Sequence, residues 1–245
     1  MSGKSGPDII ENGIVLYLDA SNIRSYPGSG TTWTDLSGNS NNGTLTNGPT
    51  FSATNGGCIV FDGVDDHISI TETLGMNPNV LTLECVFEVL SDTNSTNGGA
   101  PNTHQFIAFR QNSRTAAYEG YILYYDETNR RVEIITTPSG GGQYILSSTN
   151  NSVALNTKVH VTVLFDTSQQ SIYINGNLKA GPTAKATGID YNVTHTLKLG
   201  KANAIGSTYD ACFNGRIYTF RIYNKVLTTS EILQNYNATK SRFGL

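Results

Sequence analysis

The stretch VHVTVLFDTSQQSIYINGNLKA, residues 159–180, decides the fold because it predicts two β-hairpins in succession. Apolar and polar residues alternate on both sides of a loop at 166–170, which is the period of a strand with one buried face. Asn175 and Gly176 then form the pair with positive φ that a type I′ turn requires. Consecutive hairpins of this kind build an antiparallel sheet.

The same pattern recurs along the rest of the chain. Short apolar or alternating segments bounded by turn residues predict strands at 14–18, 58–61, 67–70, 80–89, 105–110, 121–126, 131–136, 143–146, 159–166, 171–174, 196–200 and 215–223. In the last of these, strict alternation places Ile217 on the same face as Arg221 and Tyr223. So many short strands, with almost no helix, predict an all-β fold of two stacked antiparallel sheets.

One helix is predicted near the C-terminus. Thr228 and Glu231 have the spacing of a capping box. Ile232, Leu233 and Tyr236 follow as a single apolar stripe. Because this stripe needs an apolar partner, we expect the short helix to lie as a lid over a sheet edge.

Composition narrows the classes of partner. The chain has 245 residues, with 16 basic and 19 acidic side chains, and only 14% of its residues are charged. A surface wetted mainly by neutral hydroxyls and amides suits glycans better than polyanions. No cluster of Lys and Arg is present to neutralise a phosphate backbone, so we expect no nucleic-acid partner. No apolar run approaches the ~20 residues of a membrane span, so we expect no membrane partner.

The predicted organisation is an N-terminal arm at 1–12 followed by one domain at 13–245, since no internal boundary is visible. The N-terminus lacks the apolar core of a secretory signal, which indicates synthesis in the cytosol. Cys58, Cys85 and Cys212 are far apart and each lies among strand-like residues, so we expect buried free thiols.

Five separated blocks resemble the laminin G-like, concanavalin A-like jelly roll. They are GIVLYLDASN at 13–22, GSGTTWTDLSGNSNNGTLTNGPTF at 28–51, FDGVDDHI at 61–68, SIYINGN at 171–177 and GRIYTFRIYNKVLTTSEILQNYN at 215–237. The first and last blocks are similar to the form found in virion structural proteins of tailed phages, particularly cyanophages. The superfamily includes lectins, sugar-binding modules, glucanases and adhesion domains, so the resemblance implies a fold and leaves the activity open.

The similarity of the first and last blocks to phage forms implies a virion structural protein, either a capsid decoration or a tail or fibre component, and we expect it to be non-enzymatic. Such a protein would be made in the host cytoplasm, would form homo-oligomers with contacts to other virion proteins, and would adsorb host or environmental glycans. The alternative is a secreted or surface carbohydrate-binding module assisted by calcium. A glucanase is the third alternative.

The segment FDGVDDHISI, residues 61–70, offers a candidate metal site. Relatives in other settings hold calcium at a sandwich rim, and the resemblance implies that Asp65 and Asp66 lie near such a rim. Calcium is the one cofactor that we consider. The alternative is a turn in which these carboxylates bond the backbone, with His67 facing solvent on the next strand.

The segment WTDLSGNSNNGTL offers a candidate sugar-binding loop. Trp33 provides a stacking face, and Asp35 and Asn39 provide groups that bond hydroxyls. Tyr118 and Tyr121 lie beside polar loops and extend this set of candidate ligand-binding residues. The alternative is a structural turn with Trp33 in the core and the tyrosines half-buried in a sheet.

Catalytic chemistry is not expected. A retaining glucanase on this fold uses an E-x-D-x-x-E pattern that holds its two working carboxylates ~5 Å apart. Glu84 and Glu88 are the nearest approach, but Val86 lies between them where the pattern has a carboxylate. Four residues along a strand separate their backbones by ~13 Å. We therefore expect no enzyme activity.

Overall fold

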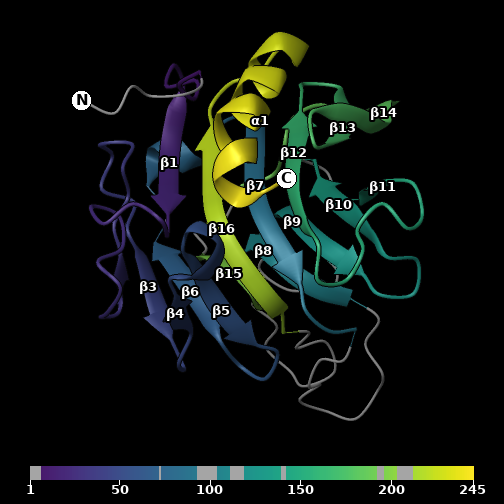
Figure 1. Cartoon of the computed structure of the whole chain (residues 1–245). Coiled ribbons are helices and arrows are strands. Elements are labelled where there is room, and N and C mark those ends of the chain that lie inside the picture. Colours follow the sequence, from purple (N-terminus) through teal and green to yellow (C-terminus); the bar gives the residue numbers. More distant parts are fainter. Residues whose placement is uncertain are drawn as a thin grey trace.

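A computed structural model describes residues 7–71, 73–92, 104–110, 119–138, 142–191, 196–202 and 212–245 (Figure 1). Sheet A contains, in spatial order, β14 (Asn177–Ala184), β13 (Gln169–Ile174), β12 (Lys158–Phe165), β7 (Leu81–Val89), β16 (Asn214–Tyr223), β5 (Cys58–Asp62) and β4 (Thr50–Ser52), with β1 (Ile14–Asp19) paired to β16. Sheet B contains β11 (Tyr144–Ser147), β10 (Arg131–Thr137), β9 (Gly120–Asp126), β8 (His104–Arg110), β15 (Thr196–Leu199), β6 (His67–Thr71), β3 (Gly43–Thr46) and β2 (Thr32–Trp33). Helix α1 (Thr229–Phe243) and two 3-10 turns (Thr54–Gly56 and Leu74–Met76) complete the elements.

The predicted two-sheet antiparallel sandwich with one C-terminal helix is confirmed. Each of the twelve predicted strands is present with its bounds shifted by no more than two residues. Strands β2 and β4 were not predicted because they are two and three residues long, too short to show a period, and β3 (GTLT) was not predicted because it contains a single large apolar residue.

The hairpins at 159–180 form as predicted. Asn175 and Gly176 both have positive φ, at 52° and 75°, which is the requirement of a type I′ turn. Strand β12 pairs with β13 and β13 with β14, all antiparallel. Local turn chemistry therefore sets one side of sheet A.

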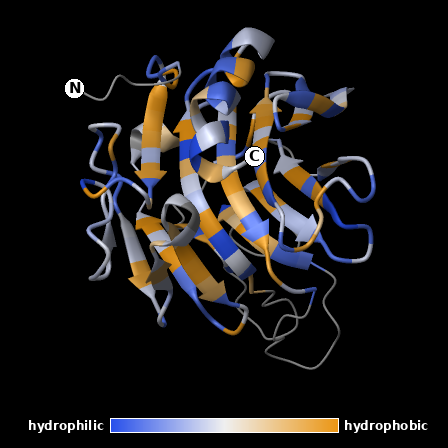
Figure 2. Ribbon diagram, in the orientation of Figure 1, coloured by the Kyte–Doolittle hydropathy of each residue, from blue (hydrophilic) through white to orange (hydrophobic). Residues whose placement is uncertain are grey.

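The inward faces of the two sheets share one hydrophobic core. Sheet A contributes Leu16, Leu18, Leu83, Phe87, Val161, Val163 and Ile217, and sheet B contributes Ile68, Ile70, Ile107, Leu123, Ile134 and Leu197. Figure 2 shows the hydrophobic colour in bands along the strands, as expected when every second side chain points inward. The three cysteines are buried and free, as predicted.

Strand β16 departs from strict alternation. Its register against β7 shifts between Ile217 and Thr219, which marks a β-bulge. Ile217 consequently packs in the core with Phe220, whereas Tyr218 packs on the outer face. The prediction that Ile217 shares a face with Arg221 was wrong because one extra residue reverses the alternation.

Helix α1 has the predicted capping box, in which the Glu231 N–H donates to the Thr228 side chain and the Thr228 N–H donates to the Glu231 carboxylate. It lies across the middle of the outer face of sheet A, in front of β7 and β12 in Figure 1, so the predicted edge position was wrong. The buried side of the helix includes Asn235 and Thr239, while Leu233 is 47% exposed. Among the described residues, no helix is long and apolar enough to cross a membrane.

The reason for this position is the polarity of the surface beneath. The outer face of sheet A carries Glu84 and Arg221, and the Asn235 amide of α1 donates to Glu84 Oε2 at 2.8 Å. Below the last turn, Phe243 packs on the Tyr218 ring with centroids 5.3 Å apart. Polar side chains of α1 thus pack on polar side chains of sheet A. The position of the helix therefore could not be predicted from the spacing of its apolar residues.

Candidate functional site

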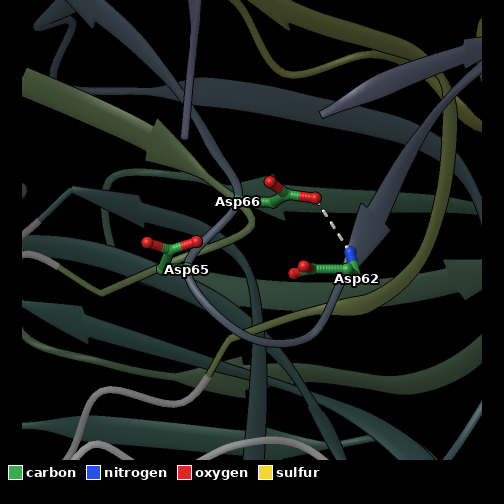
Figure 3. A group of neighbouring side chains, drawn as sticks. All are labelled: Asp62, Asp65 and Asp66. Carbon is green, nitrogen blue, oxygen red and sulfur yellow. Dashed lines mark hydrogen bonds between the residues drawn. The ribbon is translucent and has the colours of Figure 1, made fainter. Parts of the chain in front are cut away.

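Three carboxylates meet in the loop between β5 and β6. Asp62, Asp65 and Asp66 each have an oxygen within 4.8 Å of the others, and Figure 3 shows Asp66 turned toward the backbone of Asp62. Gly63 shapes the loop with a φ of 80°, and a Cβ there would approach Asn214 Cβ to 2.8 Å. Only glycine allows both features without strain.

Backbone and amide hydrogen bonds hold each carboxylate in place. Asp62 Oδ1 accepts from the Val64 N–H at 2.7 Å, and Asp66 Oδ2 accepts from the Asp62 N–H at 3.0 Å. Asp65 Oδ2 accepts from the Asn47 side chain at 2.9 Å. The turn geometry considered as an alternative is therefore present, and each of these bonds occupies one oxygen of its carboxylate.

Without a bound cation, the surroundings of this loop disfavour a negative charge on Asp66. Asp66 is only 4% exposed, and burial, together with the charges of Asp62 and Asp65, raises its pKa to about 6 despite the opposing effect of the hydrogen bond from the Asp62 N–H. His67, expected to face solvent, is instead buried, and its Nδ1 lies 3.0 Å from the Asp65 carbonyl oxygen. Burial lowers the pKa of His67, so the neutral ring adds no positive charge to the loop.

The donor set fits a calcium ion in part. Two oxygens that each lie ~2.4 Å from Ca²⁺ can be no more than ~4.8 Å apart, and the three carboxylates satisfy this limit. Three side chains supply fewer than the 6–8 oxygens that calcium takes, so backbone carbonyls or water would complete the shell. The structure adds Asp62 to the predicted pair Asp65 and Asp66, and calcium binding stays a prediction.

The predicted sugar-binding loop serves sheet A instead. Asp35 accepts from the Tyr17 N–H at 2.8 Å and from the Asn41 N–H at 3.0 Å. The Asn39 and Asn41 side chains donate to the Val15 carbonyl oxygen at 3.2 and 2.8 Å. These bonds satisfy the backbone of β1 along its open edge, so Asp35 and Asn39 have a structural role in this loop.

The aromatic members of the predicted sugar site do not present a stacking face. Trp33 and Tyr121 are buried in the core, and Tyr121 packs against Phe165 with ring centroids 5.8 Å apart. Their burial matches the alternative with Trp33 in the core, and sugar stacking by these rings stays a prediction. Tyr118 lies outside the described residues.

The two glutamates nearest to a catalytic pattern are both buried on the outer face of β7, and Glu84 lies beneath α1. Glu84 accepts from Asn235, from Thr162 Oγ1 at 3.1 Å and from Arg221 Nη1 at 3.4 Å. Burial raises the pKa of Glu84, and the charge of Arg221 opposes that shift. Four residues further along β7, on the same face, Glu88 pairs with Arg216 Nη1 at 2.9 Å and accepts from the Tyr218 hydroxyl at 2.8 Å.

A cavity of about 330 Å³ lies on the outer side of β1. Apolar lining comes from Ile9, Ile14 and Leu36, together with Tyr17. Polar lining comes from Glu11, Asn22, Arg24 and Ser37. Sequence reasoning missed this site because its residues come from separate segments that form no motif, and only the fold brings them together.

Fold and site together define a β-sandwich of the lectin-like class. Residues 62–233 match the family model of the concanavalin A-like lectin/glucanases superfamily, of laminin G type. This match covers more than half of the chain, and the chain belongs to that family. Comparison with curated protein sequences gave no match.

Solved structures with the same fold include binding domains and an enzyme. The binding domain of Paraclostridial Mosquitocidal Protein 1 superposes with a TM-score of 0.70 at 15% identity, over 93% of this chain and 52% of that one. The ligand binding domain of botulinum neurotoxin serotype D, solved with N-acetylneuraminic acid, gives 0.66 at 15% identity, over 93% and 51%. Trypanosoma rangeli sialidase with sialic acid gives 0.62 at 16% identity, over 94% and 33%.

The chain thus spans about half of the two toxin domains and a third of the sialidase. At these identities the likeness shows the fold alone, and the predicted concanavalin A-like jelly roll is confirmed. Since the fold occurs in both an enzyme and in binding domains, activity has to be argued from the site. The phage assignment stays a prediction.

Proposed function

We propose that this chain is a non-catalytic carbohydrate-binding domain. Its membership of a lectin-like family supports the binding role. The observation that carries the non-catalytic part is the burial of Glu84 beneath α1 and of Glu88 on the same strand, each paired with an arginine.

The geometry of this pair opposes hydrolysis. A glycosidase needs one carboxyl group that gives up a proton to the leaving oxygen and a second that attacks the sugar or activates water, both facing an open cleft. Glu84 is 1% exposed and already accepts hydrogen bonds from Asn235, Thr162 and Arg221. A sugar would have to displace α1 to reach it.

A glycan array tests the binding role. Binding of the purified chain to at least one carbohydrate class, with no release of reducing sugar from β-glucans and no release of sialic acid from sialosides, is the expected result. Running the array with calcium and with a chelator tests the calcium-assisted alternative. Absence of binding across the array, or hydrolysis that disappears in Glu84→Gln, would overturn the proposal.

We also propose the finer role as a phage virion component that presents this domain as a capsid decoration or as part of a tail or fibre. The similarity of residues 13–22 and 215–237 to phage forms supports it, together with the weakly charged surface. Mass spectrometry of purified particles should detect the chain at many copies alongside other virion proteins, and light scattering should show a homo-oligomer. A monomer that is absent from particles would contradict this role and leave carbohydrate binding untouched.

A further inference from the structure

We propose that the cavity beside β1 binds one uncharged sugar unit of a glycan. This inference rests on the carbohydrate-binding function proposed above and specifies a site and a ligand class for it. The cavity lies between the segment at 9–14, strand β1, and the loops at 22–24 and 36–37. It is separate from the Asp62, Asp65 and Asp66 loop.

Size limits the ligand. At about 330 Å³ the cavity is at the lower end of the ~300–1,000 Å³ range of small-molecule sites. That volume suits one pyranose ring with its hydration better than several consecutive rings. The ligand is therefore a terminal or side-branch sugar.

One wall is apolar and fixed. Ile9, Ile14 and Leu36 line it together with the ring of Tyr17. The Tyr17 hydroxyl is committed to Asp19 Oδ2 at 2.9 Å, and the Arg221 guanidinium lies 4.9 Å from the ring centroid. Both contacts hold the ring in one orientation. An aromatic ring beside aliphatic side chains packs against the C–H face of a pyranose.

The other wall offers both donors and acceptors. Asn22 Oδ1 accepts from the Arg24 N–H at 3.0 Å, which fixes the turn and leaves the Asn22 amide group to donate. Within the described part of the chain, the Arg24 guanidinium and the Glu11 carboxylate form no ion pair. Ser37 Oγ is already bonded to Asp35 Oδ2 at 2.7 Å. Three groups, Glu11, Asn22 and Arg24, are thus available to a ligand.

The charge balance selects the class of sugar. One cation and one anion line the cavity, so its formal charge is zero. A sugar hydroxyl both donates and accepts, so it can bond to a carboxylate and to a guanidinium at once. A carboxylated sugar would gain from Arg24 but would also meet Glu11, and that repulsion removes the advantage.

The site is preorganised. The Leu36 N–H donates to the Tyr17 carbonyl at 2.8 Å, and the Ile14 N–H donates to the Glu11 carbonyl at 3.1 Å. The Ile10 N–H donates to Asn235 Oδ1 of α1 at 2.7 Å. Each side of the cavity is therefore tied to sheet A or α1, and binding need not order it first.

Amide chemical-shift titration of the ¹⁵N-labelled chain tests the site. The probes are neutral methyl glycosides of glucose, galactose, mannose and N-acetylglucosamine, compared with methyl glucuronide and the methyl glycoside of N-acetylneuraminic acid. We expect shifts at residues 9–14, 22–24 and 36–37 with a neutral glycoside. Because the ligand is uncharged, its affinity should change less than about twofold between 50 and 500 mM salt.

Variants then assign the contacts. Arg24→Gln and Asn22→Ala should each weaken binding about tenfold, the effect of losing one well-formed hydrogen bond in a ligand site. Lys179→Gln is the matched control, because Lys179 is exposed on β14 and is not among the cavity residues. Equal melting temperatures would show that the variants are folded.

Each alternative outcome is distinct. Shifts centred on residues 62–66, or full affinity in Arg24→Gln, would overturn the cavity as the site while leaving carbohydrate binding in place. Preference for the two acidic glycosides, with strong salt dependence, would overturn the neutral ligand class. No response to any of the six probes, with binding on the glycan array, would also reject the cavity, whereas failure of both assays would reject the proposed function as well.

Discussion

Glu84 and Arg221 face each other on the outer side of sheet A, and each is fully buried by α1. Their side chains approach to 3.4 Å, with Arg221 also stacked on Tyr17. Water can no longer stabilise either charge, so each depends on the other. Such a pair contributes little as a unit, but breaking it leaves one buried charge without compensation.

Single replacement of either partner should therefore be costly. Glu84→Leu and Arg221→Met are each expected to lower the free energy of unfolding by ~3–5 kcal/mol, because the remaining charge stays buried. The double variant should lose less than the sum of the two. Urea denaturation of the four proteins gives the coupling energy, and additive losses would contradict the argument. Arg130→Met, whose partner Asp92 is more exposed, is a control with a loss below ~1 kcal/mol.

His160, which lies beside Glu84 beneath α1, makes the free energy of unfolding depend on pH. Burial, followed by the positive charge of Arg221, lowers the pKa of this ring to about 3, even though Glu84 Oε1 lies 3.6 Å away. From α1, the uncharged Tyr236 ring lies with its centroid 6.0 Å from that of His160. Glu84 is already committed to Arg221 and Asn235, so it does not offset the burial.

The sign of the effect follows from proton linkage. In the unfolded chain a histidine binds its proton near pH 6.5, whereas the folded protein resists that proton down to about pH 3. The free energy of unfolding should therefore fall as the pH drops below ~6.5, by up to ~1.4 kcal/mol per pH unit from this one residue. His160→Gln should flatten the stability profile between pH 6.5 and 4.5 in urea titrations. Parallel profiles for His160→Gln and wild type would contradict the assignment.

Calcium binding at Asp62, Asp65 and Asp66 has a direct readout. If the ion binds the folded chain alone, 100 times its dissociation constant adds ~2.7 kcal/mol of stability. For a domain of this size that is a rise in melting temperature of roughly 5–10 °C. The rise should disappear in Asp65→Asn, and in Asp66→Asn, but should persist in the control Asp166→Asn. An unchanged melting temperature with millimolar calcium would show that this loop does not bind the ion.

At the scale of elements, the loop that follows Trp33 acts as a cover for β1. Asp35 alone accepts from Tyr17, Asn41 and Ser37, and the loop returns a donor to Tyr17 through the Leu36 N–H. The loop therefore completes the pairing that a neighbouring strand would otherwise provide. Its Asn and Asp content looks like a ligand loop in sequence because the same groups bond sugars and backbone equally well.

Removing the Asp35 carboxylate, which holds this loop together, should expose the edge of β1. Asp35→Ala is expected to lower the free energy of unfolding by ~3 kcal/mol, since several backbone and hydroxyl donors lose their acceptor. Asn39→Ala, at an exposed position of the same loop, should cost less than ~1 kcal/mol. Denaturant titration measures both, and static light scattering on warming should show aggregation of Asp35→Ala first. Equal costs for the two variants would contradict the role given to Asp35.

The elements also show which features sequence can predict. Alternation and turn residues identified the longer strands, and the capping box located the start of α1, because these signals are local. The bulge at Ile217 and the resting place of α1 could not be predicted, because both depend on partners in another part of the chain. In the candidate site, Asp65 and Asp66 were found from one short motif, while Asn22 and Arg24 meet Glu11 only after folding.

At the scale of the whole molecule, the two faces of sheet A have different surroundings. The inner face joins the common core, and the outer face is closed by α1 and by the segment at 8–10, which is bonded to Gln234 and Asn235. This cover buries the Glu84 carboxylate. It also forms the cavity at its margin beside β1. This arrangement supports the proposed non-catalytic binding role.

The cover over β1 has a further consequence for how copies of the chain can associate. A sheet with a bare margin can grow by recruiting strands from other molecules, which leads to fibres. Here the chain's own loop takes those positions on the β1 side, and on the opposite margin Pro182 of β14 has no N–H to offer. Association of copies at these two margins would then depend on side-chain contacts of defined shape and not on backbone pairing between strands.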